Sequence, residues 1–254
     1  MKQLRTQMRV IFALVLREAR TRHGRARLGY AWAIIEPLAM ITFLTLLFSQ
    51  FRTSNGPDGN FALFFATGVL AFQAYRNTSV YICNSFAQNK NLFNYPMVKP
   101  IDAALARLFL DCATHVFVIA LVLIGQIVLM DANPPHDIPY MAFAMSLLFF
   151  MALGAGLCLA VLRRFSQAVF SLYLIVMGPA FFLSCVFYSL ATVPTGFREI
   201  LKLNPLVHGV EGFRTGYYAV YPNDDVSLFY LFTWAVTLNF LGWIGERLTR
   251  FQNQ

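Results

Sequence analysis

Apolar residues run along most of this chain in stretches of about 20, and short polar stretches separate them. A helix of about 20 apolar residues is long enough to cross the ~30 Å core of a bilayer. Turn-forming residues fill the stretches at 53–60 (TSNGPDGN) and 131–137 (DANPPHD). The pattern predicts an all-α integral membrane protein with six transmembrane helices, within a single transmembrane domain over 1–254. The predicted spans are 30–51, 61–82, 105–130, 138–162, 168–190 and 226–245.

The first 24 residues follow a different pattern, in which apolar residues recur at helical spacing between arginines. An amphipathic helix with a basic polar face lies along a membrane surface rather than across the membrane. Residues 1–24 are therefore expected to lie on the inner surface. Two interpretations stay open, a plain membrane anchor and a helix that also contacts a cytoplasmic partner. The apolar positions are Leu4, Met8, Ile11, Phe12, Val15 and Ala19.

The region 195–218 holds two short amphipathic segments that are broken apart at Asn204-Pro205. Neither segment is long enough to span a bilayer. Two such helices in succession predict a re-entrant hairpin that dips into the outer leaflet, where non-helical backbone must be buried in protein. Glu211 and Arg214 lie three residues apart on the second helix, so they can pair.

Composition supports a membrane location. Hydrophobic residues make up 58% of the chain and charged residues only 13%, whereas a soluble domain carries about 25% charged residues. The mean hydropathy is +0.57. The net charge of +8 comes from basic residues beside apolar spans, which favours an anionic lipid leaflet over nucleic acid as the partner.

The distribution of Lys and Arg predicts the orientation. Fourteen of them flank the spans on the side that holds both termini, and four lie on the other side. Because cytoplasmic loops are enriched in Lys and Arg, both termini are expected in the cytoplasm.

Ionisable residues inside the predicted spans are costly in lipid and should face protein or a wet pathway. Arg107 and Asp111 lie four residues apart in the third span, and Arg76 lies in the second. The sequence leaves open whether Arg107 and Asp111 form a structural ion pair or line the pathway. Glu36 precedes Pro37 in the first span, and both a structural and a gating role stay open for it.

A dense basic cluster, Arg20, Arg22, Arg25 and Arg27, precedes the first span, and Tyr30 and Trp32 follow it. Arginines and interfacial aromatic residues anchor a span at the inner leaflet. The alternative is a substrate entrance, and the two roles are compatible.

The polar segment 84–96 lies on the cytoplasmic side and is too long for a tight turn. Its first half is expected to form a short helix that ends at Tyr95-Pro96, outside the membrane and available to another protein.

The chain lacks common sequence motifs of catalytic and nucleotide-binding sites. The chain contains no GxxxxGK[ST], HExxH or GxSxG, and its four His are far apart. Its four Cys lack CxxC spacing and are interpreted as small buried thiols. We expect no metal site and no catalytic residue, hence a pore subunit without its own motor.

Three stretches carry a resemblance to a known family: LREARTRHGRARLGYAWAIIEPL (16–38), LFNYPMVKPID (92–102) and NPLVHGVE (204–211). With them the chain resembles the permease subunits of ABC transporters that export capsular polysaccharide, within the ABC-2 exporter class. Permeases for O-antigen and teichoic acid share this architecture and are the first alternative. A membrane enzyme acting on polyprenyl-linked sugars is the second.

The resemblance implies a homodimer in the bacterial inner membrane, with two copies of a separate cytoplasmic ABC ATPase beneath it. ATP and Mg²⁺ would bind to that ATPase, so this chain would hold no cofactor. The cargo would be a lipid-linked polysaccharide, passed to periplasmic and outer-membrane export proteins.

The resemblance also assigns roles to segments. Residues 1–24 would be the interface helix, and 84–96 the coupling helix that docks on the ATPase, with Asn89, Lys90, Asn91, Leu92 and Phe93. The periplasmic hairpin would be 195–218, with Asn204, Pro205, His208, Glu211 and Arg214. Aromatic rings that stack on sugars would line the path, and packing or a place in the lipid belt is the alternative for each of them. The candidates are Tyr30, Trp32, Phe43, Phe72, Tyr75 and Tyr173. The arginines at 20–27 would steer an anionic head group toward the entrance.

Overall fold

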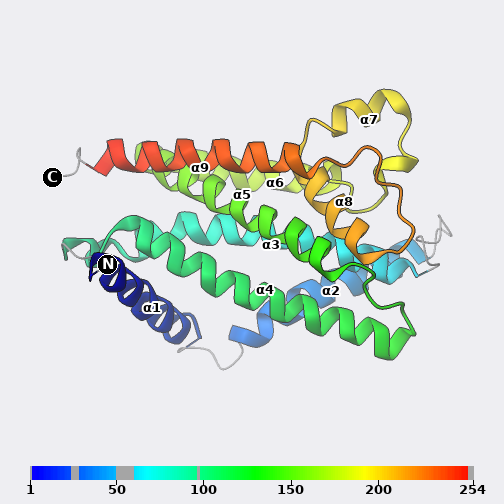
Figure 1. Ribbon diagram of the computed structural model, residues 1–254, viewed down its shortest axis with the longest axis horizontal. Helices are drawn as coiled ribbons and strands as arrows, with labels where there is room; N and C mark the ends of the chain where they lie inside the picture. The colour runs from blue at the N-terminus through cyan, green and yellow to red at the C-terminus, as the bar shows by residue number, and fades with distance from the viewer. Residues whose placement is uncertain (1, 24–28, 50–59, 96–97, 251–254) are drawn as a thin grey trace.

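The structure, a computed structural model, describes residues 2–23, 29–49, 60–95 and 98–250 (Figure 1). In this part of the chain the secondary structure consists of α-helices and two short 3-10 helices, without strands. The elements in order are α1 (Lys2–His23), α2 (Gly29–Ser49), α3 (Phe61–Gln88), η1 (Lys90–Asn94), α4 (Pro100–Met130), α5 (Ile138–Phe165), α6 (Gln167–Leu183), η2 (Leu190–Thr192), α7 (Thr195–Leu201), α8 (Pro205–Tyr217) and α9 (Leu228–Arg250).

Each predicted span overlaps one helix of the structure. By length and composition, α4, α5 and the Leu228–Thr249 part of α9 are sufficient to cross a membrane, and Ile34–Leu47 and α6 are shorter apolar helices. The central helix α3 is long enough but is not among these, because polar side chains interrupt it from Gln73 to Ser79. The fold is therefore all-helical with membrane-type helices, as the sequence predicts.

Two predicted boundaries need correction. The fifth span was expected to reach residue 190, but α6 ends at Leu183 and the chain turns through Cys185, which has a φ of 57°. The segment 84–96 does not form a helix of its own from its first residue. Instead α3 continues to Gln88, and only Lys90–Asn94 forms a separate 3-10 turn.

Short polar side chains define several helix starts. The Oδ1 atom of Asn60 accepts a hydrogen bond from the N–H of Leu63 (3.1 Å) at α3, and Asp137 accepts one from Tyr140 (2.9 Å) at α5. Such caps satisfy N–H groups that have no partner within the helix. The turn stretches of the sequence thus end where the helices begin.

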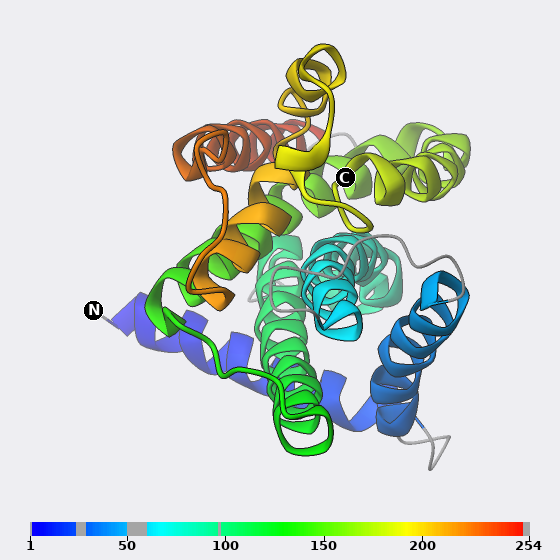
Figure 2. The same cartoon turned by 90° about the vertical axis from the view of Figure 1, so that its right-hand side faces the viewer.

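The core lies where α3, α5, α8 and α9 meet, and α3 runs near the centre of the bundle in the end-on view (Figure 2). α5 packs most extensively on α9 and next on α3. Gly154 allows the close approach to α9, because a Cβ there would lie 2.5 Å from the backbone nitrogen of Asn239. Small residues at such crossings are typical of membrane helix pairs.

The two ends of the bundle differ. The start of α1, the end of α9 and η1 lie at one end of the long axis, and α7 and α8 lie at the other (Figure 1). We call these the η1 end and the α8 end. The predicted coupling segment and the predicted hairpin are therefore on opposite ends of the molecule.

Candidate functional site

At the η1 end, α1 docks on the start of α4. Ile11 and Leu14 are buried against Ala106. The neighbouring stripe of α1 carries Met8 and Phe12, which are exposed apolar side chains. One stripe of this helix thus binds it to the bundle, and the next stripe leaves apolar side chains exposed.

Three polar contacts fix α1 more firmly. Gln7 donates a hydrogen bond to Asp102 near the start of α4. Arg17 donates to Asn89, the residue between α3 and η1. Glu18 accepts from Arg107 of α4. α1, η1 and the start of α4 are thereby joined into one unit, which we call the cytoplasmic junction, after the side predicted for this end.

Arg107 is the centre of the junction, and only 5% of it is exposed. Its Nε lies 3.8 Å from a carboxylate oxygen of Asp111, so the ion pair that was one of the two alternatives left open by the sequence forms. Its guanidinium also lies over the ring of Tyr81, 4.8 Å from the ring centre. Sequence reasoning missed the third partner, Glu18, although an acid inside a basic amphipathic helix is a visible signal.

The short helix η1 divides into an inner and an outer side. Leu92 packs against the junction, and the ring of Phe93 meets that of Phe86 at 6.3 Å. Lys90 and Asn91 are exposed, and so is Tyr95 just after η1, at 63%. Leu92 and Phe93 therefore hold η1 in place, and Lys90, Asn91 and Tyr95 are left exposed.

At the α8 end, Arg214 is fully buried. Its guanidinium donates to Glu211 (3.1 Å) and to carbonyl oxygens of Phe64 on α3 (3.1 Å) and of Val186 (2.7 Å). Gly68 leaves room for it, because a Cβ at that position would lie 2.5 Å from Arg214 Nη2. Arg214 thus fastens α8 to α3 and to the turn that follows α6.

Glu211 is also fully partnered. Besides Arg214, it accepts hydrogen bonds from the hydroxyls of Tyr221 (3.0 Å) and Ser189 (3.5 Å). Because every charge here is paired and hydrogen-bonded, the pair is a structural anchor rather than a free acid for catalysis.

Asn204, Pro205 and His208 shape the junction between α7 and α8. Asn204 caps α8 through Leu206 N–H (3.1 Å), and its amide donates to the carbonyl of Leu183 (3.1 Å). Pro205 occupies the first turn of α8, where a missing N–H costs nothing.

His208 bridges two loops. Its Nε2 lies 2.9 Å from the carbonyl oxygen of Lys202, and its Nδ1 accepts from the N–H of Ser227 (3.1 Å). This pattern requires the neutral ring with the proton on Nε2. Burial lowers the pKa of His208 below its usual value.

The helix α7 is bound through its polar side. Arg198 donates to Asp225 (3.2 Å), and Lys202 pairs with the same carboxylate. These two cations hold the pKa of Asp225 below its usual value. Phe197 and Ile200 on the other side of α7 are exposed, so this helix presents an apolar surface at the α8 end.

The aromatic residues expected along the path have different surroundings. Tyr75 is buried in α3, and Tyr173 of α6 hydrogen-bonds Ser79 (2.6 Å). Phe43 is exposed on α2, and Glu36 is half-buried.

The predicted entrance lies largely outside the described residues. Arg25 and Arg27 belong to a segment that the structure does not describe, and the same is true of the side chains of Arg20, Arg22, Tyr30 and Trp32. Their roles stay predictions.

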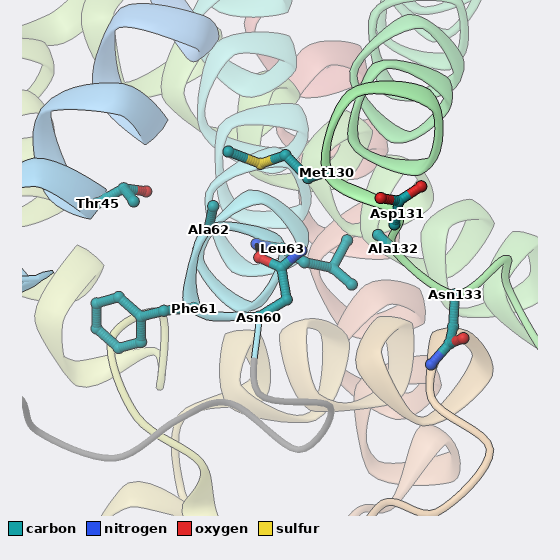
Figure 3. Close-up of a pocket in the computed structure, with 9 residues that line it drawn as sticks. All are labelled: Thr45, Asn60, Phe61, Ala62, Leu63, Met130, Asp131, Ala132 and Asn133. Carbon is teal, nitrogen blue, oxygen red and sulfur yellow. Dashed lines mark hydrogen bonds between the residues drawn. The ribbon is translucent and has the colours of Figure 1, made fainter.

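A pocket of about 450 Å³ opens at the α8 end between α2, α3 and α4. Thr45 of α2 and the ring of Phe61 lie on one side, Asp131 and Asn133 lie on the other, and Asn60 lies between them (Figure 3). Hydroxyl, amide and carboxylate groups beside an aromatic ring can hydrogen-bond and stack on a polar ligand. No pattern in the sequence pointed to this pocket, because its residues come from three helix ends.

Within the described residues, no three His, Cys, Asp or Glu side chains gather as metal ligands. All four cysteines are free thiols, and Cys83 and Cys185 are buried.

The amino-acid sequence of this chain is similar to those of known proteins. The family described as ABC-2 type transporter matches residues 9–218. The polysialic acid transport protein KpsM of Escherichia coli is 34% identical over 232 residues, which cover 91% of this chain and 89% of that protein.

Two further relatives carry related names. The capsule polysaccharide export inner-membrane protein CtrC of Neisseria meningitidis is 34% identical, over 86% of this chain and 82% of its own length. The capsule polysaccharide export inner-membrane protein BexB of Haemophilus influenzae is 29% identical, over 85% of this chain and 82% of its own length.

Proposed function

The chain belongs to the ABC-2 type transporter family, and we propose on this basis that it is the permease subunit of an exporter for capsular polysaccharide. One observation carries the proposal. Relatives named for polysialic acid transport and for capsule polysaccharide export align over most of their length and most of this chain. The cargo is a lipid-linked polysaccharide, and the membrane is the bacterial inner membrane.

The motor is a separate subunit. The chain has no phosphate-binding loop of its own, so a cytoplasmic ABC ATPase supplies ATP hydrolysis. Two permease copies and two ATPase copies form the transporter. Periplasmic and outer-membrane export proteins receive the polymer.

The topology of the proposal has six spans, formed by α2, α3, α4, α5, α6 and α9. Both termini are cytoplasmic, because the basic residues gather on their side. The position of η1 and of the α7–α8 pair at opposite ends of the bundle supports this arrangement (Figure 1). The pair α7–α8 is the periplasmic re-entrant hairpin.

Coupling runs through the cytoplasmic junction. When ATP closes the two ATPase subunits, they push on the exposed side of η1. Because Arg17 joins α1 to Asn89, and Glu18 joins α1 to Arg107, the push reaches α1 and α4 together. The spans then rearrange and the polymer advances, without any covalent step in this chain.

The α7–α8 hairpin does not move independently of the spans. Arg214 fastens α8 to α3, and Asn204 fastens its start to the end of α6. α8 is therefore expected to move together with the adjoining ends of α3 and α6.

Co-purification tests the proposal. The permease, co-expressed with the ATPase encoded beside it and reconstituted in lipid, is expected to form a stable complex that hydrolyses ATP. The permease alone is the control and should not hydrolyse ATP. A permease that shows the same hydrolysis rate with and without the ATPase would overturn the assignment.

A further inference from the structure

The central helix α3 has one stripe that the rest of the chain does not fully cover. All its residues from Ala62 to Tyr75 are buried. Beyond Tyr75 the partly exposed positions follow the spacing of a single helix face. They are Arg76, Asn77, Val80, Tyr81 and Asn84.

This stripe is unusually polar for a helix inside a membrane bundle. It carries Arg76, Asn77 and Asn84, and Gln73 lies at its border. We call these four residues the polar strip. They extend over about 16 Å along the helix, which is roughly half the thickness of the hydrocarbon core. Side chains of this kind do not face lipid tails, because an unsatisfied polar group there costs several kcal/mol.

Arg76 differs from the other arginines packed among the helices. Arg107 and Arg214 have carboxylate partners, and Arg163 donates to Asn84 (2.6 Å). In the described part of the chain, no carboxylate pairs with Arg76, and its Nε is buried without a hydrogen-bond acceptor.

The hydroxyl group that α6 carries in this region does not supply an acceptor for Arg76. The hydroxyl of Tyr173 on α6 hydrogen-bonds Ser79 instead. The guanidinium of Arg76 therefore has at least one buried donor, Nε, without an acceptor among the residues that the structure describes. Its natural acceptors are carboxylate or phosphate oxygens, which it binds with two parallel hydrogen bonds.

We propose that the polar strip faces the water-filled pathway of the transporter, and that Arg76 is the residue in it that contacts the anionic groups of the polymer. The proposal rests on the proposed function and names a substrate class within it, an acidic glycan. The amide of Asn77, partly exposed beside Arg76, offers donors and an acceptor for sugar hydroxyls. A polar surface of this kind allows a wide, hydrated polysaccharide to pass without a tight binding pocket.

Charged thiol reagents test the strip without the natural substrate. The intact transporter is used with its four native cysteines replaced by alanine and Asn77→Cys introduced, after export has been verified. One methanethiosulfonate reagent carries a sulfonate and the other a quaternary ammonium group. Both are expected to label Asn77→Cys, and the anionic one faster, because Arg76 attracts it.

The second variant isolates the charge. Adding Arg76→Gln should lower the ratio of anionic to cationic labelling rates about tenfold, as expected for removing one unit charge a few ångströms away in water. Arg76→Lys should keep the ratio. Val116→Cys, on an exposed apolar position of α4, is the lipid-facing control and should stay unlabelled.

Three results would overturn the proposal. Asn77→Cys that neither reagent labels would place the strip against lipid or protein. Rapid disulfide formation between Asn77→Cys in two copies, with labelling blocked, would make it a contact between subunits. An unchanged ratio in Arg76→Gln would remove Arg76 from the pathway. The proposed function is tested by a different experiment, and it fails if the permease forms no complex with an ATPase.

Discussion

Arg107 of α4 donates a hydrogen bond to Glu18 of α1, inside a junction from which solvent is largely excluded. Asp111 lies on the other side of the same guanidinium. Two carboxylates from two helices thus share one cation, and α1 cannot shift on α4 without breaking a buried charge contact. In the proposed transporter this contact transmits the force of the ATPase.

Substitutions at this pair should affect stability and coupling together. Arg107→Gln removes the cation that Glu18 and Asp111 share, and Glu18 keeps a second ion pair, with Arg17 (3.6 Å). It should cost about 3–5 kcal/mol of unfolding free energy. Glu18→Gln should cost less, since Asp111 still pairs with Arg107. In the double variant the costs should not add, because the partners contact each other. Thermal unfolding of the purified permease measures stability, and ATP hydrolysis by the complex measures coupling.

Glu199→Gln is the matched control. Glu199 pairs with Lys202 at the surface (2.7 Å), where an ion pair contributes about 0–1 kcal/mol. Glu199→Gln should leave the unfolding temperature of the permease and the ATP hydrolysis rate of the complex unchanged. Additive costs for Glu18→Gln and Arg107→Gln would show that the two side chains are not coupled.

Substitutions on the exposed side and on the packed side of η1 should have different effects. Tyr95→Ala with Lys90→Ala removes exposed side chains, so it should reduce the amount of ATPase that co-purifies and leave the unfolding temperature of the permease unchanged. Leu92→Asp with Phe93→Asp should unseat η1, abolish stimulated ATP hydrolysis and leave membrane insertion intact. Gln88→Ala, exposed at the end of α3, is the control. Normal ATPase recovery with Tyr95→Ala and Lys90→Ala would contradict the outward role of these residues.

Lysine should not replace Arg214. The guanidinium is in contact with the carbonyl oxygens of Phe64, Cys185, Val186 and Tyr188 as well as Glu211, and an ammonium group has only three donors. Arg214→Lys should therefore lower the unfolding temperature, and Arg214→Leu, which leaves Glu211 buried and unpaired, should cost about 3–5 kcal/mol. Arg247→Lys, at an exposed position of α9, is the control and should have little effect. Equal unfolding temperatures for Arg214→Lys and the wild type would contradict the anchor.

Acid should loosen the contact between α7, α8 and the start of α9. The folded-state pKa of His208 lies below its usual 6.5, so the unfolded state binds the proton more readily. The stabilisation from neutral His208 is complete above about pH 6.5, and it is lost as the pH falls toward the lowered pKa. Nearby Lys202 opposes protonation and Asp225 favours it. Backbone hydrogen exchange of 201–208 should be faster at pH 5 than at pH 7.5, relative to the intrinsic rates.

The control for this prediction is His208→Gln, which does not titrate and should show little pH dependence. The same acid response in His208→Gln would assign the effect to another group. Asp225 is not a candidate above pH 5, because its pKa lies below the usual value for an aspartate.

Local patterns predicted the helices but not all of their ends. Runs of apolar residues identified each long helix, and i, i+3 spacing identified the pair of Glu211 and Arg214. The end of α6 at Leu183 escaped, because apolar residues continue beyond it. The turn there depends on tertiary hydrogen bonds, from Asn204 to Leu183 and from Arg214 to Val186.

Local sequence patterns also predicted only some of the contacts in the cytoplasmic junction. Asp111 was found as a partner of Arg107 because it lies one helical turn away. Glu18 lies 89 residues away in the chain, and no spacing rule reaches that far. The inner and outer sides of η1 were likewise invisible, since Leu92 and Phe93 have the composition of a partner surface but pack against their own protein.

The most direct test of the account is the location of the polysaccharide in cells that lack this protein. The account predicts that the polymer is still synthesised in normal amount but stays inside the cell, and that the wild-type permease restores it to the surface. Loss of the polymer itself, with no intracellular pool, would mean that the protein takes part in synthesis rather than export, and would contradict the central claim.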